Sequence, residues 1–273
     1  MNDRVLPFVK MEGLGNDYVY LDGIVGRLPD DLPGLSRRIS DRHFGVGSDG
    51  LIVLLPGEND IPLRMRMFNA DGSESEMCGN GIRCLAKYAY EAGHVTSQEF
   101  AVLTGAGVMR PQVLLDASGR VERVRVDMGR PQFGGTPEQA ITVEGQTFEG
   151  VNISMGNPHF VIFVQDAEQF PVDQYGPLIE THPNFPHRTN VEFVEVRKSD
   201  DLVMRVWERG SGITLACGTG ACAALVAARL TGRCDQRVIV HLLGGDLEVE
   251  WRSDGHVWMT GPAREVFRGQ YWL

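Results

Sequence analysis

The stretch Met77-Cys78-Gly79-Asn80-Gly81 opens one predicted helix, and Ala216-Cys217-Gly218-Thr219-Gly220 opens a second helix of the same design. Subtracting 78 from 217 gives 139, and subtracting 93 from 232 gives the same offset for Gly93 and Gly232, which follow the two helices. Glycine is favoured directly after a helix because it adopts a left-handed conformation at little cost. The two segments therefore indicate an internal duplication with a cysteine at the start of one helix in each half.

The duplication extends upstream of both helices. Residues 15–21 match residues 156–162, and residues 48–53 match residues 189–194, both at an offset of 141. Each half is predicted to contain a strand, a linker, two further strands, the cysteine-headed helix and alternating closing strands. A repeat of this length indicates a duplicated domain, since solenoid repeats have periods of about 20–50 residues. We expect residues 1–120 and the C-terminal tail 264–273 in the first half, and residues 121–263 in the second.

The helix after Cys217 is apolar almost all round, because residues 221–228 contain only Ala, Cys, Leu and Val. Such a helix has to be buried on every side. In a strand-rich half, the inside of a curled sheet is the place that can bury it. We therefore predict an α/β (α+β) fold of two pseudo-symmetric domains, each with a curled, mostly antiparallel sheet around a central helix.

The composition excludes several classes of partner. The chain has 273 residues, of which 42% are hydrophobic, enough for substantial cores. The formal net charge of −10, with no Lys/Arg cluster, argues against nucleic acid and against an anionic membrane surface. No stretch approaches the roughly 20 apolar residues of a membrane span, and the first residues do not look like a secretory signal. Five cysteines without framework spacing fit reduced thiols in the cytoplasm.

The glycines beside each thiol leave backbone N–H groups uncovered at the helix start. These N–H groups and the helix dipole favour an anion such as a carboxylate, and the same field lowers the pKa of a thiol. A carboxylate held there would have its α-carbon flanked by two sulfurs, one removing the α-proton and one returning a proton to the opposite face. Cys78 and Cys217 are therefore the predicted catalytic acid/base groups. Cys84, Cys222 and Cys234 lack a counterpart in the other half and are predicted to pack in the core.

Two other kinds of site fit these residues less well. Zinc would need a second ligand pair, and no cysteine or histidine is spaced to supply one, so no metal is expected. Residues 218–223 formally fit the G-x-G-x-x-A pattern of dinucleotide-binding proteins, and residues 45–50 fit the related G-x-G-x-x-G pattern. However, the chain lacks the alternating strand–helix order of that fold, and a phosphate loop does not explain cysteines at both helix starts. No cofactor is expected.

The two halves differ at positions close to these motifs. Tyr18 stands where the second half has His159, and Asn69 stands where it has Glu208. Glu208 could accept a hydrogen bond from an ammonium group, and Arg209 could bind a second carboxylate through two parallel hydrogen bonds. A substrate that lacks the pseudo-symmetry of the protein requires differences of this kind.

The run from Asn69 to Arg83 resembles the signature of the diaminopimelate epimerase family. Residues 13–18, 156–160, 190–194, 208–210 and 216–222 resemble the other blocks of that family, in the same order, so the resemblance covers essentially the whole chain. It implies a PLP-independent isomerase that interconverts LL- and meso-2,6-diaminopimelate, in the biosynthesis of lysine and peptidoglycan precursors. It also implies an active site in the cleft between the two halves, and a homodimer.

The resemblance further implies roles for single residues. Cys78 and Cys217 would be the two bases, His159 and Glu208 would tune their acid/base behaviour, and Glu208 would also accept the reacting ammonium group. The reacting carboxylate would be held by the main-chain amides of Gly79, Asn80, Gly218 and Thr219. The distal amino-acid head would be bound by Asn16, Asn69, Asn157, Asn190 and Arg209.

Two positions depart from the family pattern. Gly50 stands where many members have Gln, which puts one substrate contact in doubt. Ile213 stands where the family usually has Glu, which puts the support of the loop before Cys217 in doubt.

Three rival functions differ in the residues that they need. A proline-racemase-like enzyme would need no set of Arg and Asn residues for a second amino-acid head. An isomerase of the phenazine-pathway type would lack the cysteine pair, and a non-catalytic amino-acid-binding protein would not require it.

Overall fold

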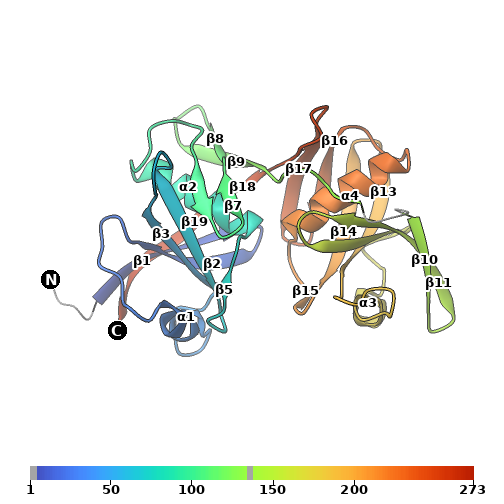
Figure 1. Cartoon of the computed structure of the whole chain (residues 1–273), viewed down its shortest axis with the longest axis horizontal. Helices are drawn as coiled ribbons and strands as arrows, with labels where there is room; N and C mark the ends of the chain where they lie inside the picture. The colour runs from blue at the N-terminus through green and yellow to red at the C-terminus, as the bar shows by residue number, and fades with distance from the viewer. Residues whose placement is uncertain (1–4, 134–137) are drawn as a thin grey trace. The chain divides into compact units, whose positions relative to one another are not determined.

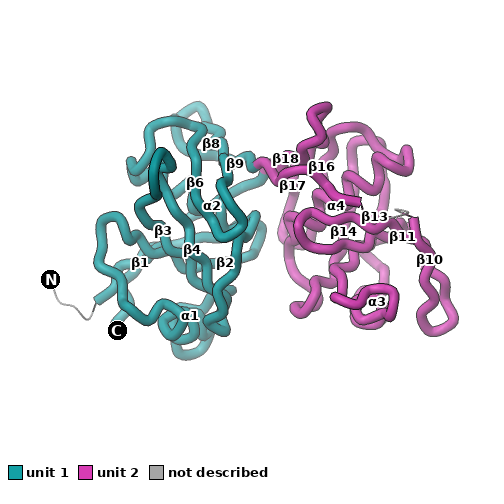
Figure 2. Tube along the Cα trace, viewed as in Figure 1, with its two compact units in different colours: residues 1–126, 261–273 teal, residues 127–260 magenta. Residues whose placement is uncertain are grey.

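The computed structural model describes residues 5–133 and 138–273, which fold into two compact units (Figure 2). Unit 1 takes in the chain up to Val126 together with Gly261–Leu273, and unit 2 is Asp127–Thr260. The expected boundary after residue 120 therefore moves to residue 126. The reason is that strand β9 (Val121–Asp127) forms an antiparallel hairpin with β8 (Gln112–Leu115), which a boundary at residue 120 would break.

Unit 1 is a mixed sheet with two helices (Figure 1). Its strands run in the order β19-β1-β2-β3-β4-β6-β7, with the short β5 paired to β4. The β2–β3 and β4–β6 pairs are parallel, and the other pairs along this order are antiparallel. Its remaining elements are β1 (Val5–Gly13), β2 (Asn16–Asp22), α1 (Leu32–Ser40), β3 (Gly50–Pro56), β4 (Leu63–Asn69), β5 (Glu74–Ser75), α2 (Gly79–Glu91), β6 (Val102–Thr104), β7 (Gly107–Met109) and β19 (Arg264–Trp272).

Unit 2 repeats this plan. Its strands run in the order β10-β11-β12-β13-β14-β16-β17-β18, with β15 paired to β14. The parallel pairs are β12–β13 and β14–β16, at the same places as in unit 1. The elements are β10 (Glu138–Val143), β11 (Gln146–Ser154), β12 (Pro158–Phe163), α3 (Val172–Glu180), β13 (Asn190–Lys198), β14 (Asp201–Glu208), β15 (Gly212–Ile213), α4 (Gly218–Leu230), β16 (Arg237–Leu242), β17 (Gly245–Trp251) and β18 (Val257–Pro262).

The two central helices are buried as predicted. Within its own unit α4 packs against β11 to β14, β16 and β17, and every residue from Gly220 to Ala228 is buried (Figure 1). In unit 1, α2 packs against β1, β2, β3 and β8. The glycines after the helices, Gly93 and Gly232, have φ of 78° and 68°, the left-handed conformation that ends a helix.

The linkers expected between the strands each contain a nine-residue helix that sequence analysis did not predict. The helix α1 buries Leu32, Leu35 and Ile39, and α3 buries Val172 and Ile179, so both helices present one apolar face to the outer side of a sheet. Strands β3 and β13 are therefore covered on both faces, by a central helix and by an outer helix.

The strand register corrects one detail of the duplication. Tyr18 pairs with Gly50 in the parallel β2–β3 ladder, and His159 pairs with Asn190 in the β12–β13 ladder. Gly50 therefore corresponds to Asn190, an offset of 140 between β3 and β13 instead of the expected 141. A shift of one residue matters in a strand, because it exchanges the two faces of the sheet.

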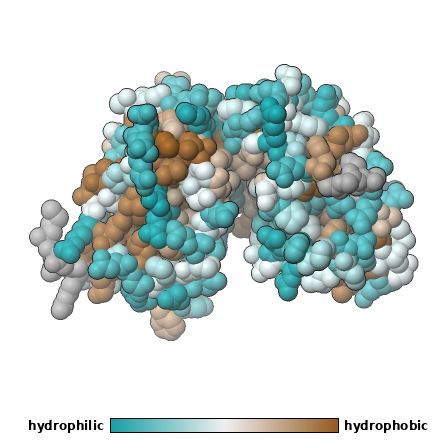
Figure 3. All heavy atoms as spheres, viewed as in Figure 1, coloured by the Kyte–Doolittle hydropathy of each residue, from teal (hydrophilic) through white to brown (hydrophobic). Residues whose placement is uncertain are grey.

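The surface visible in Figure 3 is a mixture of hydrophilic and hydrophobic residues on both units. Among the exposed large apolar side chains are Val266, Phe267 and Trp272, all on β19, which is the last strand of its sheet. Across the described residues, every helix is too short or too polar to cross a bilayer.

Candidate active site

Both predicted thiols lie at the N-cap of a central helix. Cys78 and Cys217 have extended backbone conformations. Each sulfur accepts a hydrogen bond from the backbone amide three residues later, from Gly81 N at 3.4 Å and from Gly220 N at 3.3 Å. The sulfur thus takes the place of the oxygen that usually caps a helix. A cap of this kind orients the sulfur, and the first amides of the helix have no preceding turn to bond with.

In unit 1, three polar side chains surround Cys78. Tyr18 directs its hydroxyl at the sulfur over 3.7 Å, and the Cys78 thiol lies 3.6 Å from Asn16 Oδ1. Asn80 Nδ2 donates to the same oxygen of Asn16 at 3.4 Å. Asn16 stands at the start of β2 and Tyr18 two residues later, so one strand supplies both. All three side chains around this sulfur are formally neutral.

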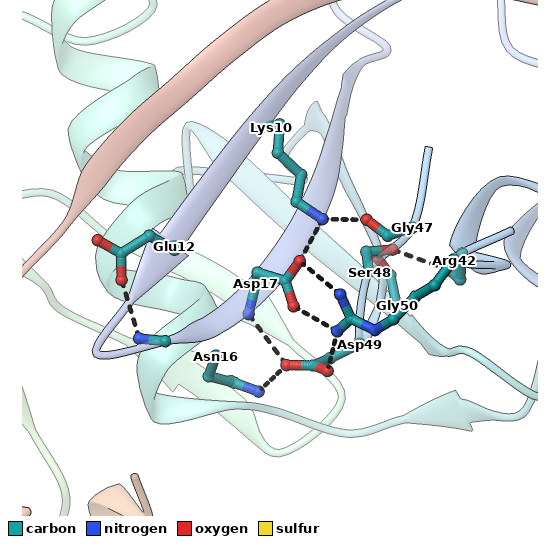
Figure 4. A network of polar contacts seen from close by, with 11 residues as sticks. Lys10, Glu12, Asn16, Asp17, Arg42, Gly47, Ser48, Asp49 and Gly50 are labelled. Atoms are coloured by element: carbon teal, nitrogen blue, oxygen red, sulfur yellow. Dashed lines mark hydrogen bonds and ion pairs between the residues drawn. The ribbon is translucent and has the colours of Figure 1, made fainter. Parts of the chain in front are cut away.

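A network of charged residues fixes Asn16 from its other side (Figure 4). Asn16 Nδ2 donates to Asp49 Oδ2 at 2.6 Å, and Arg42 forms ion pairs with Asp49 at 2.9 Å and with Asp17 at 2.7 Å. Lys10, which is buried, forms an ion pair with Asp17. Burial works to raise the pKa of Asp17, but the hydrogen bonds from Arg42 and Lys10 hold it below its usual value. Asn16 is therefore oriented with its amide nitrogen toward Asp49 and its oxygen toward Cys78.

Gly50, the first departure from the family pattern, has no room for a side chain. It pairs with Asn69 across the β3–β4 ladder, and a Cβ at residue 50 would lie 2.2 Å from Phe68 O and 3.1 Å from Tyr18 Cε1. A larger residue would require the backbone or Tyr18 to move. Asn69 itself donates from Nδ2 to Ser73 Oγ at 3.0 Å, in the turn that follows β4.

In unit 2, a continuous chain of hydrogen-bonding groups leads away from Cys217. Its sulfur lies 3.6 Å from Thr219 Oγ1, which accepts from Asn157 Nδ2 at 3.2 Å. Asn157 Oδ1 lies 3.0 Å from His159 Nε2, and His159 Nδ1 lies 2.6 Å from Glu192 Oε1. His159 and Glu192 are 1% and 0% exposed. Cys217 is therefore linked to a fully buried ionisable pair, whereas Asn16 links Cys78 to the partly exposed Asp49–Arg42 pair.

Glu208 lies at the end of β14, close to the same thiol. It accepts a hydrogen bond from the hydroxyl of Thr214, and burial raises its pKa, with the nearby carboxylate of Glu192 adding to the increase. Glu208 also interacts with Cys217 directly. A carboxylate with a raised pKa that borders a thiol can accept a hydrogen bond from an ammonium group and stabilise it.

Asn190 and Arg209, both predicted to bind the distal head, contact each other. Asn190 Oδ1 accepts from Arg209 N at 2.9 Å, and Asn190 Nδ2 donates to Pro158 O at 2.8 Å. The Arg209 guanidinium donates to His187 O at 3.3 Å. In this structure the Asn190 amide holds the backbone of β12 and of the turn after β14, so it positions Arg209.

The loop before Cys217 is supported by a residue that sequence analysis missed. Glu180, buried at the end of α3, accepts from Trp207 Nε1 at 2.8 Å and from Gly210 N at 2.9 Å. Ile213, the second departure from the family pattern, is 50% exposed and pairs with Trp207 through β15. Two hydrogen bonds to the buried Glu180 and the β14–β15 hairpin therefore hold this loop.

The expected lowering of the two thiol pKa values is not found. Burial raises the pKa of Cys78, and the Gly81 amide and the Tyr18 hydroxyl offset only part of this increase. Burial raises the pKa of Cys217 well above its usual value, and the charges of Glu208 and Glu192 raise it further. The correction has a simple cause, since removing a thiolate from water outweighs the favourable field of a helix start.

Glu192 is the second residue that sequence analysis did not assign. Its signal is the run Val191-Glu192-Phe193-Val194, in which a single carboxylate interrupts a strand of apolar residues that is buried on both faces. A glutamate is almost never fully buried unless it is paired. A glutamate in such a run therefore indicates a specific partner inside the protein.

Comparisons with known proteins agree with this arrangement. The family model for diaminopimelate epimerase matches residues 8–134 and 151–266. A diaminopimelate epimerase from Moorella thermoacetica is 54% identical over 278 residues, covering 97% of this chain and 99% of its own. One from Synechocystis sp. is 48% identical over 279 residues, covering 97% and 98%. The chain therefore belongs to the diaminopimelate epimerase family.

Solved structures show the same fold at low identity. A hydroxyproline epimerase from Agrobacterium vitis is 16% identical with a TM-score of 0.73, and the match covers 100% of this chain and 94% of that one. A PhzF-family phenazine biosynthesis protein from Bacillus anthracis is 15% identical with a TM-score of 0.75, covering 99% and 100%.

Proposed function

We propose that this member of the diaminopimelate epimerase family interconverts LL- and meso-2,6-diaminopimelate by proton transfer at one α-carbon, with Cys78 and Cys217 as the two acid/base groups. The reaction is an isomerisation without pyridoxal phosphate, and it belongs to the synthesis of lysine and of peptidoglycan precursors. The observation that carries the proposal is that each unit places one thiol at the N-cap of its central helix, where the first amides have no preceding turn to bond with.

In the proposed mechanism, one cysteine starts as a thiolate and the other as a thiol. The thiolate takes the α-proton from one face, and the thiol gives its proton to the opposite face, so the two sulfurs exchange protonation states in each turnover. The negative charge that develops on the substrate carboxylate is stabilised by the amides of Gly79, Asn80, Gly218 and Thr219. Two forms of the free enzyme follow, and each form binds one isomer productively.

The raised thiol pKa values suit this chemistry. The α-proton of an amino acid is weakly acidic, and a thiolate that is disfavoured in the free enzyme is a stronger base once it forms. The substrate ammonium group supplies the positive charge that such a thiolate needs. We assign this ammonium to Glu208, whose pKa is raised by burial and which already borders Cys217.

The distal amino-acid head is assigned to Arg209 and to the asparagines Asn16, Asn69, Asn157 and Asn190. Arg209 is the group that can bind a carboxylate through two parallel hydrogen bonds, and Asn190 holds its backbone in place. Sites built to hydrogen-bond a substrate group reject analogues that lack it by roughly 10⁴-fold or more. L-lysine and L-proline, which lack the second amino-acid head, should therefore be very poor substrates.

The test is to measure kcat/KM for LL-diaminopimelate, L-lysine and L-proline with enzyme dialysed against a chelator and free of pyridoxal phosphate. We expect conversion of LL- to meso-diaminopimelate, with a preference over both mono-amino acids of about 10⁴-fold. A preference below about tenfold would show that the second-head site is misassigned and would favour a general amino-acid racemase.

We also propose a cytoplasmic homodimer. All five cysteines are free, and two of them must stay reduced for the proposed reaction. The strand β19 ends its sheet with Val266, Phe267 and Trp272 exposed, and an exposed apolar edge strand favours pairing with a second copy. Sedimentation equilibrium at micromolar concentration should give the mass of two chains, and a monomer mass would reject this assembly.

A further inference from the structure

Glu192 and Ile52 occupy the same position in the two units. In each unit the residue lies two positions beyond the partner of Tyr18 or His159 in the parallel ladder, since those partners are Gly50 and Asn190. A Cβ placed on Gly81 would lie 2.5 Å from Ile52 Cδ1, and one placed on Gly220 would lie 2.8 Å from Glu192 Oε1. Both side chains therefore support the first turn of a central helix, directly behind the thiol. In unit 1 this support is a hydrocarbon, and in unit 2 it is a carboxyl group.

The burial of Glu192 is unusual for a purely structural residue. It is 0% exposed, its Oε1 lies 2.6 Å from His159 Nδ1, and its Oε2 has no hydrogen-bond partner among the described residues. A buried carboxyl group with one free oxygen is costly, and a hydrocarbon at this position would pack as Ile52 does. The short contact between the carboxyl group and the imidazole fixes the orientation of the His159 ring.

The ionisable groups around the two thiols differ accordingly. Cys217 is faced by Glu208 from β14 and by Glu192 from β13, and it is connected through Thr219 and Asn157 to His159 on β12. Cys78 is faced by the Tyr18 hydroxyl from β2 and by Arg83 on its own helix, and it is connected through Asn16 to the Asp49–Arg42 ion pair. The strand β3 contributes only Ile52 at this point. Within unit 2, the Glu192–His159 pair is therefore connected to the Cys217 thiol.

We propose that Glu192 is a positioning residue for the proton transfer at Cys217, because it holds His159 behind the start of α4 and keeps a buried carboxyl group close to the Cys217 thiol. In this arrangement the carboxyl group of Glu192 opposes the ionisation of Cys217, because two anions close together in a dry interior repel each other strongly. The assignment rests on the proposed function, but its test does not.

The test is the pH dependence of alkylation of each cysteine by iodoacetamide, followed by mass spectrometry of the separate peptides and normalised to the rate at high pH. Glu192→Gln keeps the shape and can donate to His159 Nδ1, but it removes the negative charge. We expect the Cys217 profile to move to lower pH by about one unit or more, while the Cys78 profile moves by less than about 0.3 unit. Ile52→Val, at the matched position in unit 1, should leave both profiles unchanged.

A second variant tests the role of Glu192 if Glu192→Gln does not fold. His159→Gln leaves the carboxylate without its imidazole, so the Cys217 profile should move to higher pH, opposite to the first variant. Circular dichroism and the thermal midpoint report folding separately. An unmoved Cys217 profile in a folded variant, equal shifts at both cysteines, or shifts of the same sign in both variants would overturn the proposal. Because no substrate is present, these outcomes are independent of the proposed epimerase activity.

Discussion

The surroundings of Cys78 and Cys217 show which features of a duplicated site were kept and which diverged. The backbone is the same in both units, with a cysteine N-cap, a glycine three residues later and a parallel strand pair beside it. The side chains differ, since Tyr18, Asn16 and the charged Arg83 lie around Cys78, whereas the carboxyl groups of Glu208 and Glu192 lie around Cys217. In the proposed mechanism, the shared backbone geometry supports both proton transfers, and the differing side chains bind a substrate that lacks this symmetry.

The largest expected effect tests what the two sites share. Cys78→Ala and Cys217→Ala should each lower kcat by at least about 10²-fold, because a general acid/base group typically supplies 10²–10⁴-fold. Both variants should keep the far-UV circular dichroism of the wild type, and Cys84→Ala serves as the control for losing a buried thiol. If removing one of the two cysteines lowers kcat by less than about tenfold, the two units do not contribute equivalent acid/base groups.

The next effect tests the side of the comparison that is specific to unit 2. Glu208→Gln removes the negative charge proposed to accept the substrate ammonium, and a hydrogen bond to a charged group contributes about 1.5–3 kcal/mol. We expect kcat/KM to fall by about 10- to 100-fold. Asn69→Ala, at the corresponding position of unit 1, should lower kcat/KM less. Equal losses of kcat/KM in both variants would mean that the reacting ammonium does not bind to unit 2.

A smaller effect is expected from the corresponding residue in unit 1. Tyr18→Phe removes the hydroxyl 3.7 Å from Cys78 and leaves the ring in place. A single neutral hydrogen bond contributes about 0.5–1.5 kcal/mol, so kcat should fall by about 2- to 10-fold. His159→Asn, at the matched position, should lower kcat more because it also separates Glu192 from its hydrogen-bond partner His159. A larger loss from Tyr18→Phe than from His159→Asn would reverse the comparison.

The smallest effect concerns stability at alkaline pH. Burial raises the pKa of both thiols in the folded state, so each thiol contributes stability below its unfolded pKa, and that contribution is lost as pH rises toward the folded value. The increase is larger for Cys217. Between pH 7 and pH 10, Cys217→Ser should therefore lose less unfolding free energy than the wild type, by about 1 kcal/mol. Urea unfolding at both pH values measures this, and Cys78→Ser should show a smaller difference.

Much of this architecture could be predicted from the sequence. The apolar run after Cys217 and the matched glycines predicted the buried helices, since a helix without a polar face has to be buried on every side. The helices α1 and α3 were missed because each is only nine residues long and contains proline and glycine, as at Pro33 and Pro177. Their apolar residues recur at helical spacing, but the window is too short for the pattern to stand out.

The site was harder to predict than the fold because its chemistry depends on contacts across strands. The duplication suggested an offset of 141 for β3 and β13, and that offset hides the correspondence between Ile52 and Glu192, which only the strand register reveals. The thiol pKa values were expected to fall because the helix field can be read from sequence, whereas the depth of burial cannot. Glu180 was missed because its partners lie far along the chain, Trp207 in β14 and Gly210 in the turn after it.

The central claim is that two thiols act on opposite faces of one carbon, and hydrogen exchange tests it most directly. LL-diaminopimelate is incubated with the wild-type enzyme in D₂O, and the isomers are separated at low conversion and analysed by mass spectrometry. We expect one deuterium at the epimerised α-carbon of the meso product and none in the recovered LL isomer, because the sulfur that delivers the hydrogen has exchanged with solvent and is not the one that removed it. A meso product that retains the original hydrogen, or recovered LL isomer that carries deuterium as often as the product, would show that a single base serves both faces and would contradict the two-thiol mechanism.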